Sequence, residues 1–524
     1  MDRIGIIDIV IVAAYLIFII WWGLRHGKSN GTGSYFLAGR SMPWWIVGLS
    51  LFAASISSTT LIGQTGDAYA TGISVFNYNL TGVLVLVFFA TFLLPLYIKS
   101  GIYTIPEFLE KRFDRKSRYY FSTICIIGNV FLDAAGALYA AALILKLMFP
   151  AVSLNVFIII FAVIAASYTI PGGLSAAINT ELIQAMILLV GSIILMLCCF
   201  LGGGFEYLGE LISGGDTAMK LIRPLNDSST PWLGLIVGMP VLGIYFWANN
   251  QTLVQRVLSA ENVNQGRICV MLSGFLTLTT LVLFNMPGVM ARKFFPGLDN
   301  PDMVYPSLVM NMLPTGLLGI MLAAMLAALT STLSAILTSS STLFTMDFYS
   351  KIDKNADEKK LVKVGKIASL VIIVIAAIWA PNIEKFGSLL KYYQEMLSYI
   401  SPPIVATFLM GIFCRRTNEK GAFAGLLSGL AVAVAMLFFR KSIFGNLHFL
   451  LIVPILFLFS ALVIWIVSVC TEKPSPDKLE NTVFRKDDFR KETEELKSVK
   501  WWRNYRWMSL ALVVLCAILL IVFR

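Results

Sequence analysis

Long apolar blocks alternate with short polar segments along nearly the whole chain. A typical block has about 18–25 residues, which is the length an α-helix needs to cross a lipid bilayer. The blocks lack the regular alternation of apolar and polar residues that marks the strands of a membrane β-barrel. The pattern therefore predicts an all-α polytopic membrane protein with about fourteen transmembrane helices. They are expected at residues 6–24, 43–71, 75–98, 120–148, 153–170, 177–201, 231–251, 268–291, 314–346, 362–381, 388–413, 420–439, 446–470 and 505–523.

The composition excludes several classes of protein. Of the 524 residues 57% are hydrophobic and 14% are charged, against about 45–50% and about 25% in soluble domains. A soluble enzyme, a nucleic-acid-binding module and a disordered chain do not fit these values. The seven cysteines show no CxxC spacing and there are two histidines, so neither a disulfide framework nor a zinc site is indicated. We therefore expect the lipid bilayer as a partner, no nucleic acid, no obligate protein partner and no enzymatic activity.

The distribution of Lys and Arg predicts the orientation in the membrane. Of the 41 Lys and Arg, 30 lie in or beside the loops that follow odd-numbered spans and 9 lie on the opposite side. Loops on the cytoplasmic side are enriched in these residues. The protein is thus expected in the cell (inner) membrane with both termini extracytoplasmic. The longest charged loop, 471–506, is expected to be a cytoplasmic linker with a short surface helix.

Three of the predicted spans carry polar residues near the middle of the membrane. Residues 53–60 contain five hydroxyl side chains and are followed by glycines, residues 243–251 end in three amide side chains, and residues 330–334 and 338–342 are rich in Ser and Thr. Ser and Thr in a membrane helix often serve packing alone. A helix that unwinds here exposes carbonyl groups, which are tolerated at this depth only around a cavity or a ligand. Carbonyl and hydroxyl oxygens together suit a monovalent cation, and we expect Na⁺.

The broken spans also indicate how the chain is organised. The second and seventh spans each begin a set of five, and an odd number of spans gives the two sets opposite orientations. Interrupted helices at matching places in inverted halves are typical of secondary transporters. The expected divisions are an extra helix with its loop (1–42), a first inverted repeat (43–201), an extracytoplasmic loop (202–230), a second inverted repeat (231–414) and C-terminal helices (415–524).

Several motifs, in order along the chain, resemble those of the sodium/solute symporter family. Within it the chain is most similar to sodium–galactose (sodium/glucose-type) symporters. The resemblance implies a LeuT-like core of two inverted five-helix repeats that works by alternating access. The motifs lie at residues 35–40, 43–45, 101–108, 168–176, 255–256, 345–349 and 411–429.

The resemblance also implies where Na⁺ binds. The principal site of the family uses carbonyls and hydroxyls from the broken first core helix and the eighth core helix. Some members have a second site with an acidic residue and two hydroxyls, for which this chain offers Glu181 and Ser334 but has Ala335 in place of the other hydroxyl. The principal-site positions here are Ala53, Ile56, Ala328, Ser331 and Thr332.

The implied solute site departs from the sugar-transporting pattern. Gln394 matches a sugar-binding Gln, and Phe246 replaces the Tyr of the family's inner gate. Asp133 replaces an Asn, and a carboxylate at this depth is costly unless paired or hydrated; it should repel an anion, bind hydroxyls or pair with an amine. The candidate solute residues are Ser55, Ser57, Thr60, Tyr78, Asn79, Asp133, Phe246, Trp247 and Gln394.

These observations predict a Na⁺-coupled secondary active symporter for a small polar solute. A sugar or polyol is favoured. An organic cation or amine, and a carboxylate such as a sialic acid, are the alternatives. A cation channel or a membrane sensor fits less well, because a channel needs no solute pocket and no signalling domain is present.

Overall fold

The computed structural model describes residues 4–26, 35–36, 42–56, 59–149, 151–227, 229–386, 389–445 and 447–524. All regular elements in these ranges are helices, and β pairing there is limited to two isolated bridges. The all-α class predicted from the apolar blocks is therefore confirmed. Residues 37–40 of the first motif, together with Ser57 and Ser58 of the hydroxyl cluster, lie outside the described residues.

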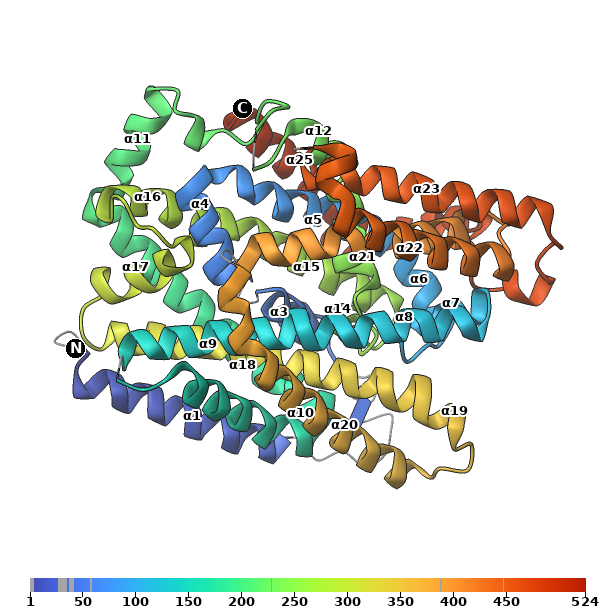
Figure 1. Ribbon diagram of the computed structural model, residues 1–524, viewed down its shortest axis with the longest axis horizontal. Helices are drawn as coiled ribbons and strands as arrows, with labels where there is room; N and C mark the ends of the chain where they lie inside the picture. Colours follow the sequence, from blue (N-terminus) through green and yellow to red (C-terminus); the bar gives the residue numbers. More distant parts are fainter. Residues whose placement is uncertain are drawn as a thin grey trace.

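The first half of the chain runs from α1 to α11 (Figure 1). Short 3₁₀ and π segments, named η, separate many of the α-helices. These elements are α1 (Ile6–His26), α3 (Trp44–Ser55), η2 (Thr59–Gln64), α4 (Thr65–Thr71), η3 (Ile73–Phe76), α5 (Asn77–Phe88), η4 (Phe89–Leu93), α6 (Leu94–Lys99), α7 (Ile105–Arg112), α8 (Arg115–Gly128), η5 (Asn129–Ala134), α9 (Ala135–Met148), α10 (Leu154–Cys199), η6 (Phe200–Gly204) and α11 (Phe205–Ser213).

The second half repeats this alternation and adds the C-terminal helices. The elements are η7 (Thr217–Met219), α12 (Trp232–Val237), α13 (Met239–Ile244), η8 (Tyr245–Asn249), α14 (Gln251–Val257), α15 (Val263–Thr280), η9 (Leu281–Asn285), α16 (Met286–Phe294), η10 (Pro301–Met303), α17 (Val304–Met312), α18 (Leu317–Thr342), η11 (Leu343–Tyr349), α19 (Ser350–Ile352), α20 (Glu358–Trp379), η12 (Ala380–Phe386), α21 (Leu389–Phe413), α22 (Glu419–Phe444), α23 (Phe449–Cys470), η13 (Pro476–Leu479), α24 (Lys486–Lys497), η14 (Trp501–Arg503) and α25 (Tyr505–Val522).

Twelve helical segments in the described ranges are long and apolar enough to cross a membrane. A thirteenth span is the pair Trp44–Ser55 and Thr60–Thr71, whose axes meet at 63°. The segment Leu154–Ser213 has 60 residues, far more than the about 20 that one crossing needs. Its backbone leaves the helical region at Gly173, with φ 61° and ψ −151°, and this break divides the segment. Counting that segment as two crossings gives fourteen, the number predicted from the sequence.

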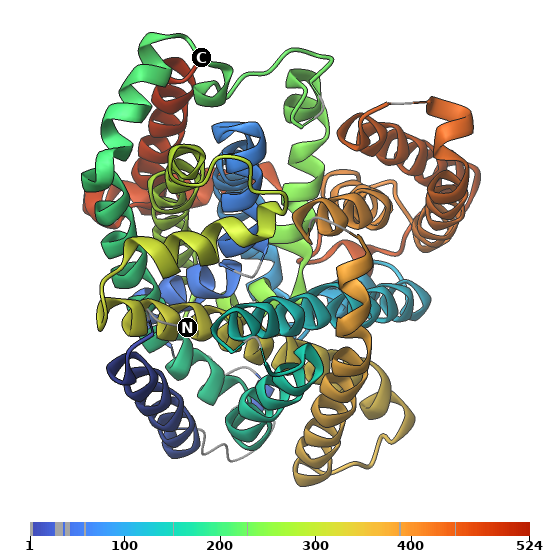
Figure 2. The same cartoon turned by 60° about the vertical axis from the view of Figure 1, so that its left-hand side comes forward.

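Helix α18 belongs to the most deeply buried of the twelve segments and lies beside α9, α10 and α20 (Figures 1 and 2). In the most apolar window of Leu317–Ile352, 94% of the residues are buried, against 17% in that of α25. Helix α10 packs along α18, and α1, α3, α9 and α20 also contact it. Small residues such as Ala324, Ala327 and Ala328 let these helices approach closely, as is usual between membrane helices.

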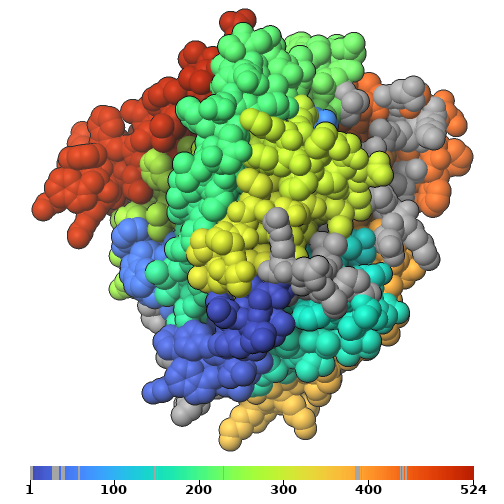
Figure 3. All heavy atoms as spheres, turned by 90° about the vertical axis from the view of Figure 1, so that its left-hand side faces the viewer, coloured from blue at the N-terminus to red at the C-terminus, as the bar shows by residue number. Residues whose placement is uncertain are grey.

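In Figure 1 α1 begins at the left end of the molecule, and α25 ends at its upper edge in the left half of the view. The Asp8 carboxylate accepts hydrogen bonds from the backbone N–H groups of Gly316 and Gly319, both at 2.7 Å. The N–H of Leu221 donates to the carbonyl of Phe523 at 2.7 Å. Figure 3, which views this end, shows the segment that follows α16 between α11 and α1.

The opposite end carries most of the charged side chains. Arg118 forms ion pairs with Glu110 and Asp347 and is 3% exposed. The charged loop 471–506 is folded onto this end, where Lys478 Nζ donates to the Glu110 carbonyl at 2.9 Å and Glu492 lies 2.9 Å from Arg267. The short surface helix predicted within the loop is α24.

Candidate functional site

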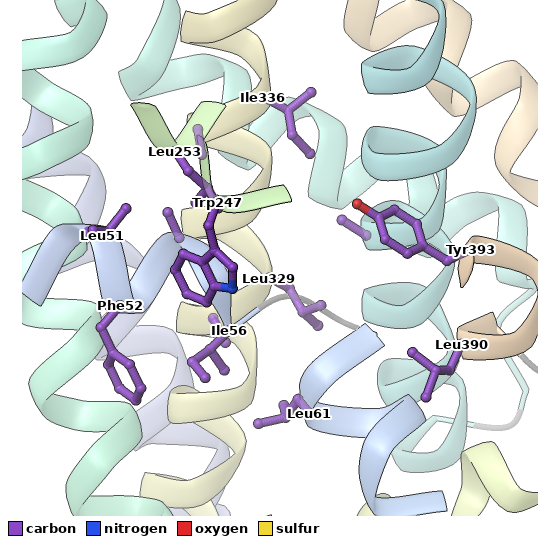
Figure 4. Packing of buried hydrophobic residues seen from close by; sticks show 14 of the residues in the cluster. Leu51, Phe52, Ile56, Leu61, Trp247, Leu253, Leu329, Ile336, Leu390 and Tyr393 are labelled. Carbon is purple, nitrogen blue, oxygen red and sulfur yellow. The ribbon is translucent and has the colours of Figure 1, made fainter. Parts of the chain in front are cut away.

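A cavity lies where the broken span meets helices from the second half of the chain. Its wall comes from the end of α3, η2, α5, α13, η8, α15 and α21. Figure 4 shows Ile56 and Trp247 on one side of this region, and Leu390 and Tyr393 projecting from α21 on the other. The side chains around it are Ser55, Ile56, Thr60, Gln64, Tyr78, Asn79, Met239, Leu242, Gly243, Phe246, Trp247, Thr277, Thr280, Leu390, Tyr393, Gln394 and Leu397.

The cavity brings together seven of the nine predicted solute residues. They come from segments more than 300 residues apart in the sequence, and they line one space: Ser55, Thr60, Tyr78, Asn79, Phe246, Trp247 and Gln394. Ser57 lies outside the described residues. The remaining residue, Asp133, faces a neighbouring cavity.

Two amide side chains form the polar wall of the cavity. Gln64 Nε2 donates to Asn79 Oδ1 at 2.7 Å, and Asn79 Nδ2 donates back to Gln64 Oε1 at 3.1 Å. Asn79 Nδ2 also donates to Thr280 Oγ1 at 2.5 Å. Gln64 and Thr280 are not among the predicted site residues. The four-residue spacing from Thr60 to Gln64 is a signal for Gln64, because such residues share one helix face.

Asp133 lies in a second cavity that adjoins the first. Cys125, Asn129, Tyr245 and Asn250 also line this second cavity. The Tyr393 hydroxyl donates a hydrogen bond to the Asp133 carboxylate. Tyr393 belongs to the wall of both cavities, so its ring stands between Asp133 and the space lined by the other solute residues.

The predicted principal cation site lies where α3 breaks next to α18. Residue Ile56 leaves the helix with φ −83° and ψ 78°, and its N–H donates to the Ala53 carbonyl at 3.2 Å. Thr332 Oγ1 donates to the Ala328 carbonyl at 3.0 Å. Ser331 is 1% exposed, and its hydroxyl has no hydrogen-bond partner among the described residues. A buried hydroxyl without a partner is costly, and a Na⁺ ion is a ligand that its oxygen can satisfy.

The two residues predicted for a second cation site have other partners. Both oxygens of Glu181 accept hydrogen bonds from the Arg256 guanidinium, one at 3.0 Å, and Ser50 Oγ donates to the same carboxylate. Ser334 Oγ accepts from Thr169 Oγ1 at 3.0 Å. A cation at this place has to compete with a guanidinium for the carboxylate.

The family model of the sodium:solute symporter family matches residues 35–429, about three quarters of the 524-residue chain. The chain belongs to this family. This sodium:solute symporter is 35% identical to "Sodium/glucose cotransporter 1" of Mus musculus, over 90% of this chain and 79% of the relative. It is also 35% identical to "Solute carrier family 5 member 4" of Rattus norvegicus, over 90% of this chain and 78% of the relative.

Two solved structures share the fold of this sodium:solute symporter. A substrate-bound, outward-open Na⁺-coupled sialic acid symporter has a TM-score of 0.79 and 22% identity, over 90% of this chain and 99% of that one. Mhp1, a nucleobase-cation-symport-1 family transporter in a closed conformation, has a TM-score of 0.58 and 17% identity, over 88% and 99% of the two chains. The expected LeuT-like architecture is thereby confirmed.

A sodium:solute symporter couples the movement of Na⁺ to that of a solute, and the geometry of the broken helix suits this task. Ile56 belongs both to the predicted cation site and to the wall of the cavity. Ser55, one residue earlier, also lines the cavity. An ion that holds the broken end of α3 against α18 therefore also fixes one wall of the cavity, which is a direct route for coupling.

Proposed function

We propose that this symporter imports a small neutral solute rich in hydroxyl groups, a sugar or a polyol. The observation that supports this proposal is the chemistry of the described cavity wall. It presents hydroxyls, the amides of Asn79, Gln64 and Gln394, and aromatic rings, and none of its residues carries a formal charge. Amides and hydroxyls both donate and accept hydrogen bonds, as sugar hydroxyls do, and an apolar aromatic surface suits the carbon face of a sugar ring.

Carboxylates and amines fit this wall less well. An ion enters a deep site at a large desolvation cost unless an opposite charge or several hydrogen bonds compensate it. The described residues of the cavity wall offer a carboxylate solute no Arg or Lys. An amine has Asp133 only beyond Tyr393, in the adjoining cavity. One of the relatives with 35% identity, "Sodium/glucose cotransporter 1" of Mus musculus, carries glucose in its name, which agrees with a sugar.

We propose that the broken helix uses Na⁺ to build the solute site. Carbonyls of Ala53, Ile56 and Ala328 and hydroxyls of Ser331 and Thr332 surround the ion, which crosses the membrane with the solute as the two inverted repeats, 43–201 and 231–414, rearrange. One Na⁺ that moves down about 100 mV supplies about 2.3 kcal/mol. At about 1.4 kcal/mol for each tenfold step, the voltage alone supports roughly 40-fold accumulation of solute.

We propose that both termini are extracytoplasmic, in the cell (inner) membrane. The end of the molecule that carries Asp8 and Phe523 has few Lys and Arg, whereas the end with Arg118, Lys351 and Lys478 has many. The positive-inside rule assigns the second end to the cytoplasm. Solute import then runs from the first end to the second.

A ligand screen on the purified protein tests the proposal. The probes are D-glucose, D-galactose and myo-inositol as neutral solutes, choline as an amine-type cation and N-acetylneuraminate as a carboxylate, each in NaCl and in KCl. A ligand at 100 times its dissociation constant stabilises the folded state by about 2.7 kcal/mol. We expect a neutral probe to raise the Tm in NaCl and not in KCl. Stabilisation by choline or N-acetylneuraminate, and by none of the neutral probes, contradicts the proposal.

A further inference from the structure

Tyr393 lines both the solute cavity and the second cavity. The second cavity contains Gln251, whose side chain accepts a hydrogen bond from the N–H of Ile105 at 2.7 Å and donates to the carbonyl of Tyr103 at 3.2 Å. Ile105 begins α7, which belongs to the end rich in Lys and Arg. The second cavity, here named the inner cavity, therefore lies toward that end.

The partition between the cavities is made by two short pieces of chain. Tyr393 and Leu397, one helical turn apart on α21, line both cavities. On η8, Tyr245 lines the inner cavity while the next residue, Phe246, lines the solute cavity. The partition is thus about one side chain thick.

The hydrogen bond that closes this partition comes from Tyr393. Phe246 has no hydroxyl, so it contributes packing alone, and its ring meets Trp247 edge-on with 5.2 Å between the centroids. The Tyr393 hydroxyl, in contrast, is bonded to the carboxylate of Asp133 on η5. A hydroxyl that donates to a carboxylate makes a stronger bond than one between two neutral groups. The ring of Tyr393 is therefore held across the passage by a link between α21 and η5.

We propose that Tyr393 is the inner gate of this symporter and that Asp133 is the residue that latches it. Release of solute toward the cytoplasm requires the bond between them to break and the ring to turn out of the passage. Asp133 then acts on transport through Tyr393. This proposal rests on the proposed direction of transport, but it does not depend on which solute is carried.

The chain supplies its own reporter for the opening of this gate. Cys125 lines the inner cavity, is 4% exposed and is hydrogen-bonded to Tyr245. A protein in which Cys198, Cys199, Cys269, Cys414, Cys470 and Cys516 are replaced by Ser or Ala keeps Cys125 as its single thiol. The rate at which a small methanethiosulfonate reagent modifies Cys125 then measures how often the inner cavity opens.

The test compares this rate in the single-cysteine protein and in its variants, in NaCl and without solute. Tyr393→Phe keeps the ring and removes the latch, and we expect it to raise the modification rate roughly tenfold or more, as the loss of a hydrogen bond to a charged group implies. Asp133→Asn should raise the rate in the same direction by a smaller factor. Tyr392→Phe is the matched control, because this neighbouring tyrosine lines neither cavity, and its rate should equal that of the parent.

The outcomes distinguish a Tyr393 that opens and closes the passage from one that only lines the two cavities. Each variant is first shown to keep the Na⁺-dependent rise in Tm, so that a change in rate reports opening of a folded protein. Equal Cys125 rates in the parent and in a folded Tyr393→Phe or Asp133→Asn protein refute the gate. Because the assay contains no solute, failure of every sugar and polyol in the ligand screen leaves this result unchanged and overturns the proposed solute class alone.

Discussion

Glu181 of α10 and Arg256 of α14 form an ion pair whose side chains are both fully buried. Ser50 of α3 donates a third hydrogen bond to the same carboxylate. The pair therefore ties together three helices beside the broken span, close to the chain segments that hold the proposed Na⁺ site. Because the pair is buried, we expect it to affect both the stability of the fold and the number of Na⁺ ions that bind.

Loss of one partner of this pair should be strongly destabilising. Arg256→Gln leaves the Glu181 carboxylate buried without a counter-charge, which typically costs about 3–5 kcal/mol. We expect a large fall in the Tm of the purified protein, and a partial recovery when Glu181→Gln is added. Lys497→Gln is the control, since its partner Glu494 is exposed and such pairs contribute about 0–1 kcal/mol. A Tm in Arg256→Gln equal to that of this control contradicts the interpretation.

The same pair predicts that one Na⁺ accompanies each solute molecule. The Glu181 carboxylate is taken up by a guanidinium and a hydroxyl, Ser334 is bonded to Thr169, and Ala335 provides no oxygen. A second Na⁺ has too few ligands here. Reversal potentials of solute-coupled currents in proteoliposomes measure the ratio, and we expect 1:1. A ratio of two Na⁺ per solute shows that Glu181 leaves Arg256 to bind an ion.

Ser331→Ala should weaken the principal Na⁺ site. The change removes a buried hydroxyl that has no partner in the described part of the chain, so the fold loses little while the ion loses one oxygen ligand. A loss of about 1 kcal/mol corresponds to a roughly fivefold rise in the Na⁺ concentration for half-maximal uptake. Ser341→Ala is the control. Ser341 is on the same helix, about 15 Å further along it, and its buried hydroxyl also has no partner among the described residues. Equal Na⁺ dependence in the two variants removes Ser331 from the site.

The pH dependence of stability should be traceable to Glu110 at the end of the molecule that is rich in Lys and Arg. Burial raises the pKa of this carboxyl, but the hydrogen bond from Arg118 and the charges of Arg118, Lys351 and Arg115 outweigh it, so its pKa lies below the ordinary value of 4.5. A carboxyl with a lowered pKa stabilises the fold above the ordinary value, and the stabilisation is lost as the pH falls through the lowered one. Glu110→Gln should lower the Tm at pH 7, and the difference from the parent should shrink at acid pH. A constant difference across this range contradicts the assignment.

The sequence predicts the fold well because every helix that crosses the membrane must be apolar over most of its length. Each crossing needs a long apolar block, and the polar residues at 53–60 stand out inside such a block. The boundaries are less visible where helices run on from one crossing to the next. Around Gly173 a backbone with φ 61° turns the chain inside an otherwise continuous helical pattern.

The candidate site was predictable as a set of broken helices, and the pairing of side chains within it was not. The seven solute residues found in one cavity stand at positions that the family resemblance implies for the solute site. Thr280 and Tyr393 join them through packing between distant segments, which sequence spacing does not record. The ion pair of Glu181 with Arg256 could not be predicted either, because the two residues lie 75 positions apart in the chain.

Solute uptake into proteoliposomes tests the central claim most directly. The vesicles contain K⁺, the outside solution contains Na⁺ or choline, and valinomycin sets an inside-negative potential. We expect the neutral probe selected by the ligand screen to accumulate severalfold in Na⁺, with faster uptake when the potential is applied, and N-acetylneuraminate to remain at background. Uptake of the neutral probe at the same rate with and without Na⁺, or a Na⁺ current that far exceeds solute flux, contradicts Na⁺-coupled symport of such a solute.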